Sequence, residues 1–293
     1  HLLEEKIKLI EDDFGKGIKV SIESVDERFP TLIQEYTIYK DKPYLLTSVT
    51  VKSENTLSSN YMVPFAAYTT TSSHGAIKID GATELNSLFV PFDNDGFIRY
   101  RSSHISDAIE SYEASAVFDS GNGSGFIFGS ITHDIWKTAI EIKSKEDNKV
   151  DSIVVYGGAA SNLTRDTEPH GNIVAQKLVS PRIFVGFYED YRRGLEEFAD
   201  ANTAVVPALA WEGGVPFGWN SWSGAQNKVS YDLYVKNSDY IKDNLKNSNF
   251  GGKDTVYINF DSYWDNLSER EIIAAVKHVH ENGQKAGIYW TPF

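Results

Sequence analysis

The chain has 293 residues, of which 41% are hydrophobic and 24% are charged, a composition that can build one or two folded cores. Asp and Glu number 41 against 28 Lys and Arg, and the net charge of −13 argues against binding to a nucleic-acid backbone. Cysteine is absent, which excludes disulfides, thiolate metal sites and a cysteine nucleophile and is compatible with both secreted and cytoplasmic proteins. No apolar run approaches the roughly 20 residues that a membrane-spanning helix needs.

Short strands and turns dominate the region from Ile18 to about Phe187. Ile18, Val20 and Ile22 alternate with polar residues, which is the period of a strand with one buried face. Turn sequences such as Lys40–Pro43 and Ser120–Gly125 separate further β-rich runs. Many short strands with regular turns predict an antiparallel β-sandwich, which we assign to a first domain over residues 1–205.

A helix is expected at the end of this first domain. Tyr188, Tyr191, Leu195 and Phe198 recur at helical spacing and predict a helix that begins near residue 189. We place the domain boundary near residue 205, ahead of a linker that includes Gly213-Gly214.

From Pro216 onward, strand-like and helix-like segments alternate. Thr255–Phe260 and Lys285–Trp290 are apolar runs without alternation, typical of strands covered on both faces. Between them, Ser268–Glu271 is a capping box that starts a helix, and Gly283 supplies the left-handed residue that ends it. An earlier helix is expected over Ser230–Lys246. Consecutive strand–helix units predict a parallel sheet, and residues 206–293 would supply the first three units of a (β/α)₈ barrel.

Functional side chains of such a barrel project from the carboxyl ends of its strands. Here those ends carry Trp219–Trp222, Asp261–Trp264 and Tyr289-Trp290. An aromatic platform beside an acidic acceptor of hydroxyl hydrogen bonds is what a sugar pocket requires. Each side chain also has a purely structural interpretation, since an aromatic residue can pack in a core and Asp261 can cap the turn after its strand.

Three motifs carry a resemblance to a known family. Gly218-Trp219-Asn220-Ser221-Trp222, then Tyr257–Asp261, then Gly287-Ile288-Tyr289 are similar, in order and spacing, to the opening strands of the melibiase-type barrel. That barrel occurs in the α-galactosidases and α-N-acetylgalactosaminidases of glycoside hydrolase families 27 and 36. The β-rich region before it resembles the supersandwich-like amino-terminal domain of family 36. The resemblance implies the amino-terminal portion of an α-galactosidase-like hydrolase.

Residue by residue, the resemblance implies that Trp222 lines the sugar subsite, that Asp261 binds galactose hydroxyls and that Tyr289 also faces the sugar. Trp264 adjoins the second strand end and is a further candidate for substrate binding. Ser262 stands where the family has the second acid of an Asp-Asp pair. A serine is a weaker hydroxyl acceptor than a carboxylate, which leaves room for α-N-acetylgalactosamine or another α-linked sugar.

The family's mechanism is retaining hydrolysis by two aspartates roughly 5–5.5 Å apart. The resemblance puts them at later strand ends, so we expect both beyond Phe293 and no catalytic residue within this chain, which should be inactive alone. No metal or organic cofactor is implied, and the expected partner is a carbohydrate.

A partial barrel leaves an unpaired strand edge, for which homo-oligomerisation is one expectation. Two alternatives belong to other classes of protein. One is a non-catalytic carbohydrate-binding module in which the sandwich is the working part. The other is a structural surface protein with an inactive barrel.

Overall fold

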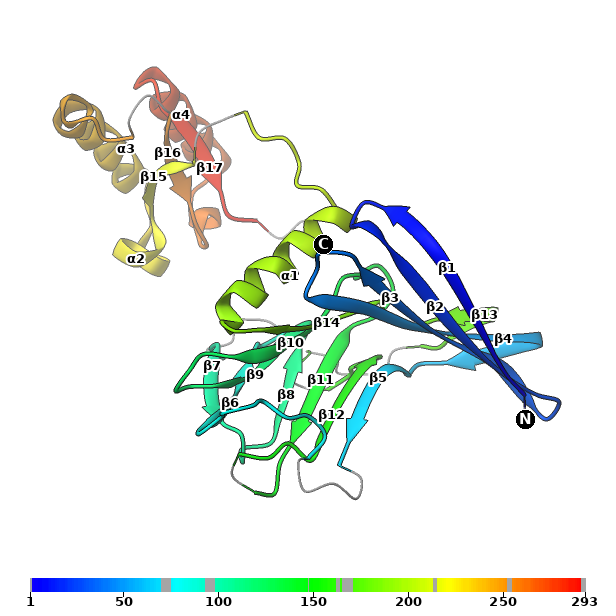
Figure 1. Cartoon of the computed structure of the whole chain (residues 1–293). Coiled ribbons are helices and arrows are strands. Elements are labelled where there is room, and N and C mark those ends of the chain that lie inside the picture. The colour runs from blue at the N-terminus through cyan, green and yellow to red at the C-terminus, as the bar shows by residue number, and fades with distance from the viewer. Residues whose placement is uncertain are drawn as a thin grey trace. The chain divides into compact units, whose positions relative to one another are not determined.

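A computed structural model describes residues 2–69, 75–92, 98–146, 148–161, 164, 171–212, 215–251 and 255–290. The chain divides into two compact units, His1–Ala208 and Leu209–Phe293, whose elements are drawn in Figure 1. Gly213 and Gly214, the expected linker residues, lie outside the described residues.

The first unit is built on a large antiparallel sheet with the strand order β1-β2-β3-β4-β14-β10-β9-β6-β7, and β13 also pairs with β4. In chain order these strands are β1 (Leu2–Asp12), β2 (Gly15–Asp26), β3 (Phe29–Tyr39), β4 (Tyr44–Ser59), β6 (Leu85–Phe89), β7 (Arg101–His104), β9 (Ala114–Asp119), β10 (Gly125–Ser130), β13 (Ile173–Val179) and β14 (Ile183–Tyr188).

A smaller antiparallel sheet faces the first, with the order β5-β12-β11-β8. Its strands are β5 (Met62–Tyr68), β8 (Ile109–Tyr112), β11 (Thr138–Lys143) and β12 (Ser152–Gly157). Val117, Phe128 and Ile183 of the large sheet and Ile140 and Ile153 of the small sheet are buried together in one apolar core. Two antiparallel sheets packed over a shared core confirm the predicted β-sandwich.

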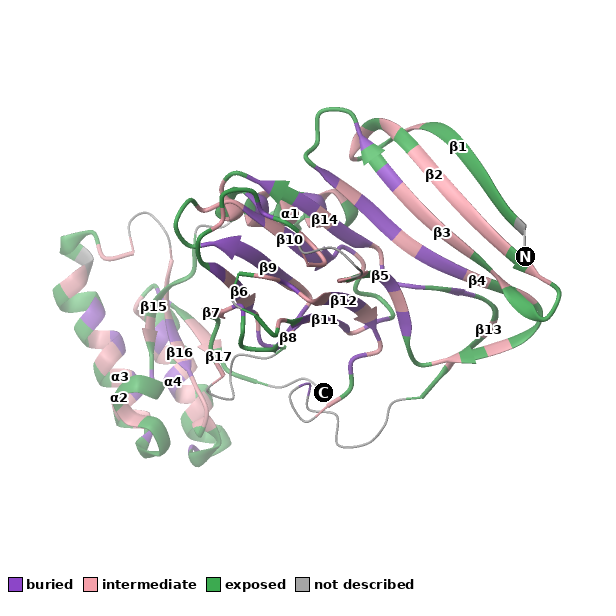
Figure 2. Ribbon diagram, turned by 60° about the horizontal axis from the view of Figure 1, so that its bottom comes forward, coloured by how far each residue is buried: buried purple, intermediate pink, exposed green. Residues whose placement is uncertain are grey.

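The first four strands form a meander in which neighbours in the chain are neighbours in the sheet. β1 and β2 pair along their full length, from Leu2↔Val25 to Asp12↔Gly15, and β3 and β4 continue the ladder. Burial increases from the mostly exposed β1 to the largely buried start of β4 (Figure 2). The next strand in the sheet is β14, which pairs with β4 through Thr47↔Ile183 and so comes from much later in the chain.

Helix α1 (Tyr191–Val205) covers the opposite face of the large sheet. Leu195 and Phe198 pack against a second buried cluster that includes Tyr44 and Phe184. The sequence placed Tyr188 on this helix, but Tyr188 ends β14. The reason is Asp190, whose side chain accepts the backbone N–H of Arg192 and thereby caps the helix one residue before Tyr191.

The second unit contains a three-stranded parallel sheet with the order β15-β16-β17. Its elements in chain order are β15 (Phe217–Asn220), α2 (Trp222–Ala225), a 3₁₀ turn (Gln226–Lys228), α3 (Tyr231–Tyr240), a π-helical turn (Ile241–Leu245), a 3₁₀ turn (Lys246–Ser248), β16 (Val256–Phe260), a 3₁₀ turn (Trp264–Asn266), α4 (Glu269–Glu281) and β17 (Lys285–Ile288).

Helix α4 has the predicted capping box, because Ser268 and Glu271 exchange side-chain to backbone hydrogen bonds, and Gly283 after it has φ of 73°. The earlier helix differs from expectation in its last part, since α3 ends at Tyr240 and the chain continues in π and 3₁₀ turns. There the side-chain amide of Asn244 donates to the carbonyl oxygen of Tyr240 and competes with the regular helical ladder.

A small core fixes the parallel sheet against its helices. The rings of Tyr234 on α3 and Phe260 on β16 stack with centroids 3.8 Å apart, and both side chains are buried. β15 approaches β16 so closely that a Cβ atom on Gly218 would lie 1.8 Å from the carbonyl oxygen of Tyr257. Only glycine fits at this point of the first strand.

Candidate functional site

The carboxyl ends of the three parallel strands lie at one edge of the sheet. The register pairs Asn220 with Asn259 and Phe260 with Ile288, so the residues that follow each strand are brought to neighbouring positions. We call the side chains of Trp222, Asp261, Ser262, Trp264 and Tyr289 the strand-end site.

Asp261 directly follows β16 and is held in place from both sides of its carboxylate. Asn220, the last residue of β15, donates its side-chain amide to Oδ2 of Asp261 at 2.7 Å. The backbone N–H of Ser262 donates to Oδ1 at 2.7 Å. A carboxylate has about four lone-pair positions, so these two bonds orient Asp261 and leave acceptor capacity for other donors.

Ser221 connects this carboxylate to the interior of the unit. The Ser221 hydroxyl is buried, and its Oγ accepts the backbone N–H of Asp261 at 3.1 Å and the hydroxyl of Tyr234 at 3.3 Å. Burial raises the pKa of Tyr234, and the hydrogen bond to Ser221 acts in the opposite direction. Ser221 therefore ties β15, β16 and α3 together directly beneath Asp261.

Trp222 lies beside an aromatic residue that the sequence did not single out. Trp222 begins α2, is 44% exposed, and its backbone N–H donates to Oδ1 of Asn220 at 2.8 Å. Its ring is parallel to that of Tyr263, with centroids 6.2 Å apart and planes 3° from parallel. Tyr263 has φ of 66°, a left-handed conformation that is rare for a bulky residue and costs about 1–3 kcal/mol.

The third strand end is joined to the second through Trp264. The indole N–H of Trp264 donates to the backbone carbonyl oxygen of Tyr289 at 2.9 Å, and the Tyr289 backbone N–H donates to the carbonyl oxygen of Phe260 at 2.8 Å. The Tyr289 side chain is 53% exposed. Trp264 thus uses its polar atom to fix the loop that bears Tyr289, whereas the phenol of Tyr289 faces solvent.

The strand-end site offers an oriented carboxylate with exposed aromatic surface on the two flanking strand ends. Asn220 links the first two ends and Trp264 links the last two, while Trp222 approaches the second end through Tyr263. Such a surface can accept hydroxyl hydrogen bonds and pack against an apolar face of a ligand.

Among the described residues there is neither a cluster of metal-ligating side chains nor a membrane-spanning helix. No group of three or more His, Asp or Glu side chains in the described ranges is arranged to hold a metal ion. None of the helices that the structure describes is both long and apolar enough to cross a bilayer.

The motif Gly218–Trp222 contains two residues of the hydrogen-bond network around Asp261 whose roles the sequence did not reveal. Asn220 and Ser221 stand between Trp219 and Trp222, and a polar pair at a strand end is a signal that could have marked them. Nothing in the local sequence marks Tyr263, because its position depends on a backbone torsion angle that tyrosine rarely adopts.

Comparisons with known proteins identify the fold. No family model and no curated protein matches the chain. The α-galactosidase from Lactobacillus brevis aligns with 100% of the chain at 13% identity and a TM-score of 0.60. The family 36 α-galactosidase AgaB from Geobacillus stearothermophilus aligns with 99% at 10% identity and a TM-score of 0.58.

A β-arabinopyranosidase also aligns with 99% of the chain, at 12% identity and a TM-score of 0.54. The chain spans 40%, 43% and 46% of the lengths of these three structures. The fold of the chain is therefore similar to part of the family 36 α-galactosidase fold, as its sequence motifs predict.

Proposed function

We propose that the chain is the amino-terminal portion of a glycoside hydrolase that removes terminal α-linked galactose-type sugars. The observation that carries the proposal is the strand-end site, where Trp222, Asp261 and Tyr289 follow three consecutive parallel strands. In this proposal the strand-end site binds the sugar, and two aspartates beyond residue 293 perform retaining hydrolysis.

The arrangement of the second unit supports an opening segment of a (β/α)₈ barrel. Its three parallel strands are sheet neighbours in chain order, and α3 and α4 lie on the connections between them. On α4, Ile273 is 61% exposed and lines an apolar depression of about 600 Å³ with Ile272 and Val276. Helix α4 is thus apolar on the side that packs against the sheet and also on part of its outer side. A helix of this kind is suited to a position between neighbouring helices in a larger ring.

The geometry of Asp261 supports a role in sugar recognition. Asn220 and the Ser262 backbone N–H fix the plane of the carboxylate before a ligand arrives, so little rotational freedom remains to be lost on binding. The free lone pairs can accept two hydroxyl protons, and hydrogen bonds to an ionised acceptor are roughly twice as strong as neutral ones. The exposed ring of Trp222 can pack against the C–H face of the same sugar.

The proposal is tested on the complete encoded polypeptide with p-nitrophenyl α-galactoside. Asp261→Asn removes the charge of the acceptor and is expected to lower kcat/KM by roughly tenfold to a hundredfold, the loss associated with one charge-assisted hydrogen bond. Asp265→Asn is the matched control, because Asp265 is an exposed carboxylate on the neighbouring 3₁₀ turn. Equal activity of the Asp261 and Asp265 variants would contradict the assignment of Asp261.

Ser262 favours a second candidate within the same class of enzyme. The described residues provide no hydrogen-bond partner for its hydroxyl, and no second carboxylate adjoins Asp261 at this position. A pocket with a neutral side chain here has room for α-N-acetylgalactosamine or another α-linked sugar. Comparing kcat/KM for the α-galactoside, the α-N-acetylgalactosaminide and the α-glucoside on the complete polypeptide separates these substrates.

A further inference from the structure

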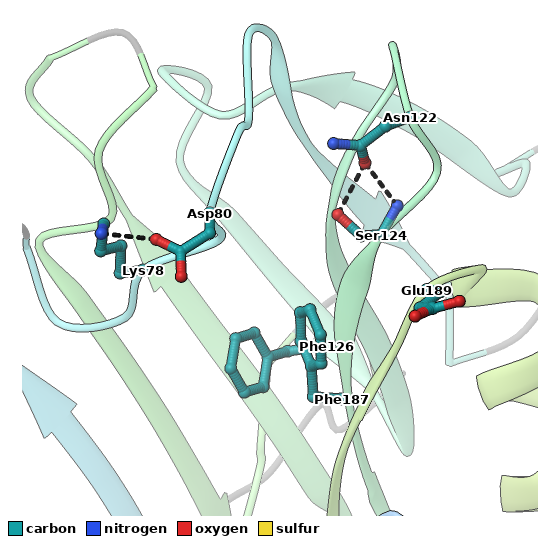
Figure 3. Close-up of a pocket in the computed structure, with 7 residues that line it drawn as sticks. All are labelled: Lys78, Asp80, Asn122, Ser124, Phe126, Phe187 and Glu189. Carbon is teal, nitrogen blue, oxygen red and sulfur yellow. Dashed lines mark hydrogen bonds and ion pairs between the residues drawn. The ribbon is translucent and has the colours of Figure 1, made fainter.

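We propose that the β-sandwich carries a carbohydrate-binding site of its own, separate from the strand-end site. The site is a cavity of about 530 Å³ that we call the sandwich-end cavity (Figure 3). Its walls come from the segment before β6, the β9–β10 turn, the start of β10 and the end of β14. The lining residues are Lys78, Asp80, Asn122, Ser124, Phe126, Phe187 and Glu189.

Two phenylalanines form the floor of the cavity. Phe126 on β10 and Phe187 on β14 are direct cross-strand partners, and their ring centroids are 4.9 Å apart. Phe126 packs against the core between the two sheets, whereas Phe187 is 40% exposed. The apolar core thus continues to the surface as an aromatic floor, which suits the C–H face of a sugar ring.

Two polar groups at the rim are available to a ligand. Oδ1 of Asn122 accepts both the backbone N–H and the hydroxyl of Ser124, at 2.8 and 2.6 Å, which directs the amide nitrogen away from Ser124 (Figure 3). The Glu189 side chain has no hydrogen-bond or ion-pair partner among the described residues. An amide donor and a carboxylate acceptor on one side of an aromatic floor match the alternating donors and acceptors of sugar hydroxyls.

Asp119 makes these walls rigid. Its buried carboxylate accepts the backbone N–H groups of Thr83 and Glu84 at Oδ1, both at 2.7 Å, and that of Asn122 at Oδ2, at 2.8 Å. Burial alone would raise the pKa of Asp119, but the backbone hydrogen bonds outweigh it and the pKa is lowered. One carboxylate thereby holds the β9–β10 turn to the segment that follows Asp80, and the cavity is formed before a ligand binds.

The charges favour a neutral ligand. Lys78 and Asp80 form an ion pair at 2.5 Å, so Glu189 contributes the net charge of the lining. A site with a net negative lining on a chain of net charge −13 repels phosphates and other anions. A cavity of this size lies within the usual range for small-ligand sites, roughly 300–1,000 Å³, and accommodates a mono- or disaccharide unit.

The test is a titration of the 293-residue chain with galactose and with raffinose, in which binding is monitored by saturation-transfer difference NMR. We expect saturable binding in the Trp222→Ala variant, which removes the exposed indole from the strand-end site. In that background, Glu189→Gln and Phe187→Ala should each weaken binding by roughly tenfold or more, as expected for losing a charge-assisted hydrogen bond or a stacking surface. Neither substitution removes a buried core side chain.

Matched controls are Glu27→Gln and Phe29→Ala, which alter exposed residues at the β2–β3 turn and should leave binding unchanged. Unchanged affinity in both Glu189→Gln and Phe187→Ala would overturn the proposal. So would binding of both sugars that is lost completely in Trp222→Ala, since that result would assign all of the binding to the strand-end site. Absence of any saturable binding to the wild-type chain would also refute it, while leaving the hydrolase proposal for the complete polypeptide untouched.

Discussion

Ser221→Ala is the substitution that best tests how the strand-end site is supported. The Ser221 hydroxyl accepts two hydrogen bonds, from the Asp261 backbone and from the Tyr234 hydroxyl. Alanine fills nearly the same volume but accepts neither. Both donors would remain in place, and the hydroxyl of fully buried Tyr234 would lose its partner.

The cost follows from the two bonds. A buried donor without a partner costs about 1–3 kcal/mol, and bonds of 3.1 and 3.3 Å are long, so the lower end applies and the sum is about 2 kcal/mol. Tyr234→Phe removes one donor and should cost about 1 kcal/mol. In the double variant the orphaned hydroxyl is gone, so the combined cost should be smaller than the sum by about 1 kcal/mol.

Urea unfolding followed by tryptophan fluorescence measures these costs, because five of the six tryptophans lie in Leu209–Phe293: Trp211, Trp219, Trp222, Trp264 and Trp290. Amide exchange at Asp261 should accelerate in Ser221→Ala and not in the control Ser223→Ala, whose side chain is exposed. Strictly additive costs in the double variant, or unchanged exchange at Asp261, would show that Ser221 does not link Tyr234 to the site.

Three further substitutions probe other contacts. Gly218→Ala should disrupt the second unit, seen as loss of its cooperative fluorescence transition, while Gly224→Ala should be tolerated because a Cβ there meets nothing within 4 Å. Asp119→Asn should destabilise the sandwich by about 2 kcal/mol at pH 7, since at least one backbone N–H in a part-buried hydrogen bond loses its charged acceptor.

The pKa of Asp119 is lowered, so its stabilising effect is present above pH 3.8 and is lost as pH falls through the folded-state pKa; the stability gap between wild type and Asp119→Asn should close there. The hydrogen bond that the His133 ring donates to the Glu113 carboxylate raises the pKa of His133 despite burial. The stabilisation that protonated His133 gives the folded state is therefore complete below pH 6.5 and is lost as pH rises through the folded-state pKa. His133→Gln should flatten that part of the profile in pH-dependent urea unfolding.

The local pattern of the sequence was sufficient to predict the antiparallel β-sandwich and the parallel pairing of the strands after it. Alternation at Ile18, Val20 and Ile22 correctly indicated a strand, β2, and the capping box at Ser268 located α4. The expected buried face of that strand was wrong, because Ile18 is exposed and Lys19 and Ser21 are as buried as Val20 and Ile22. Sheet order could not be predicted in the same way. The residues of a strand do not name its partner, and whether β4 pairs with β5 or with β14 depends on contacts between distant segments.

For the candidate sites, too, the sequence indicated individual residues but not the contacts between distant segments. Trp222, Asp261, Ser262, Trp264 and Tyr289 were named from motif and spacing, and their roles in substrate binding stay predictions. The sequence did not reveal the arrangement that supports them, since the left-handed torsion of one tyrosine and the burial of one serine hydroxyl depend on how α3 and the loops pack. The sandwich-end cavity was not predicted because its lining comes from three separate segments.

The position of β14 between β4 and β10 determines the order in which the strands of the large sheet can pair during translation. The meander of β1–β4 can form as soon as those residues leave the ribosome, because its pairs are local in sequence. Its inner edge then waits for Ile183–Tyr188, and pairing over such a distance in sequence is slow. Until β13 and β14 have been translated, the nascent chain presents an open edge on β4, and chaperone protection during translation would be most valuable in that interval.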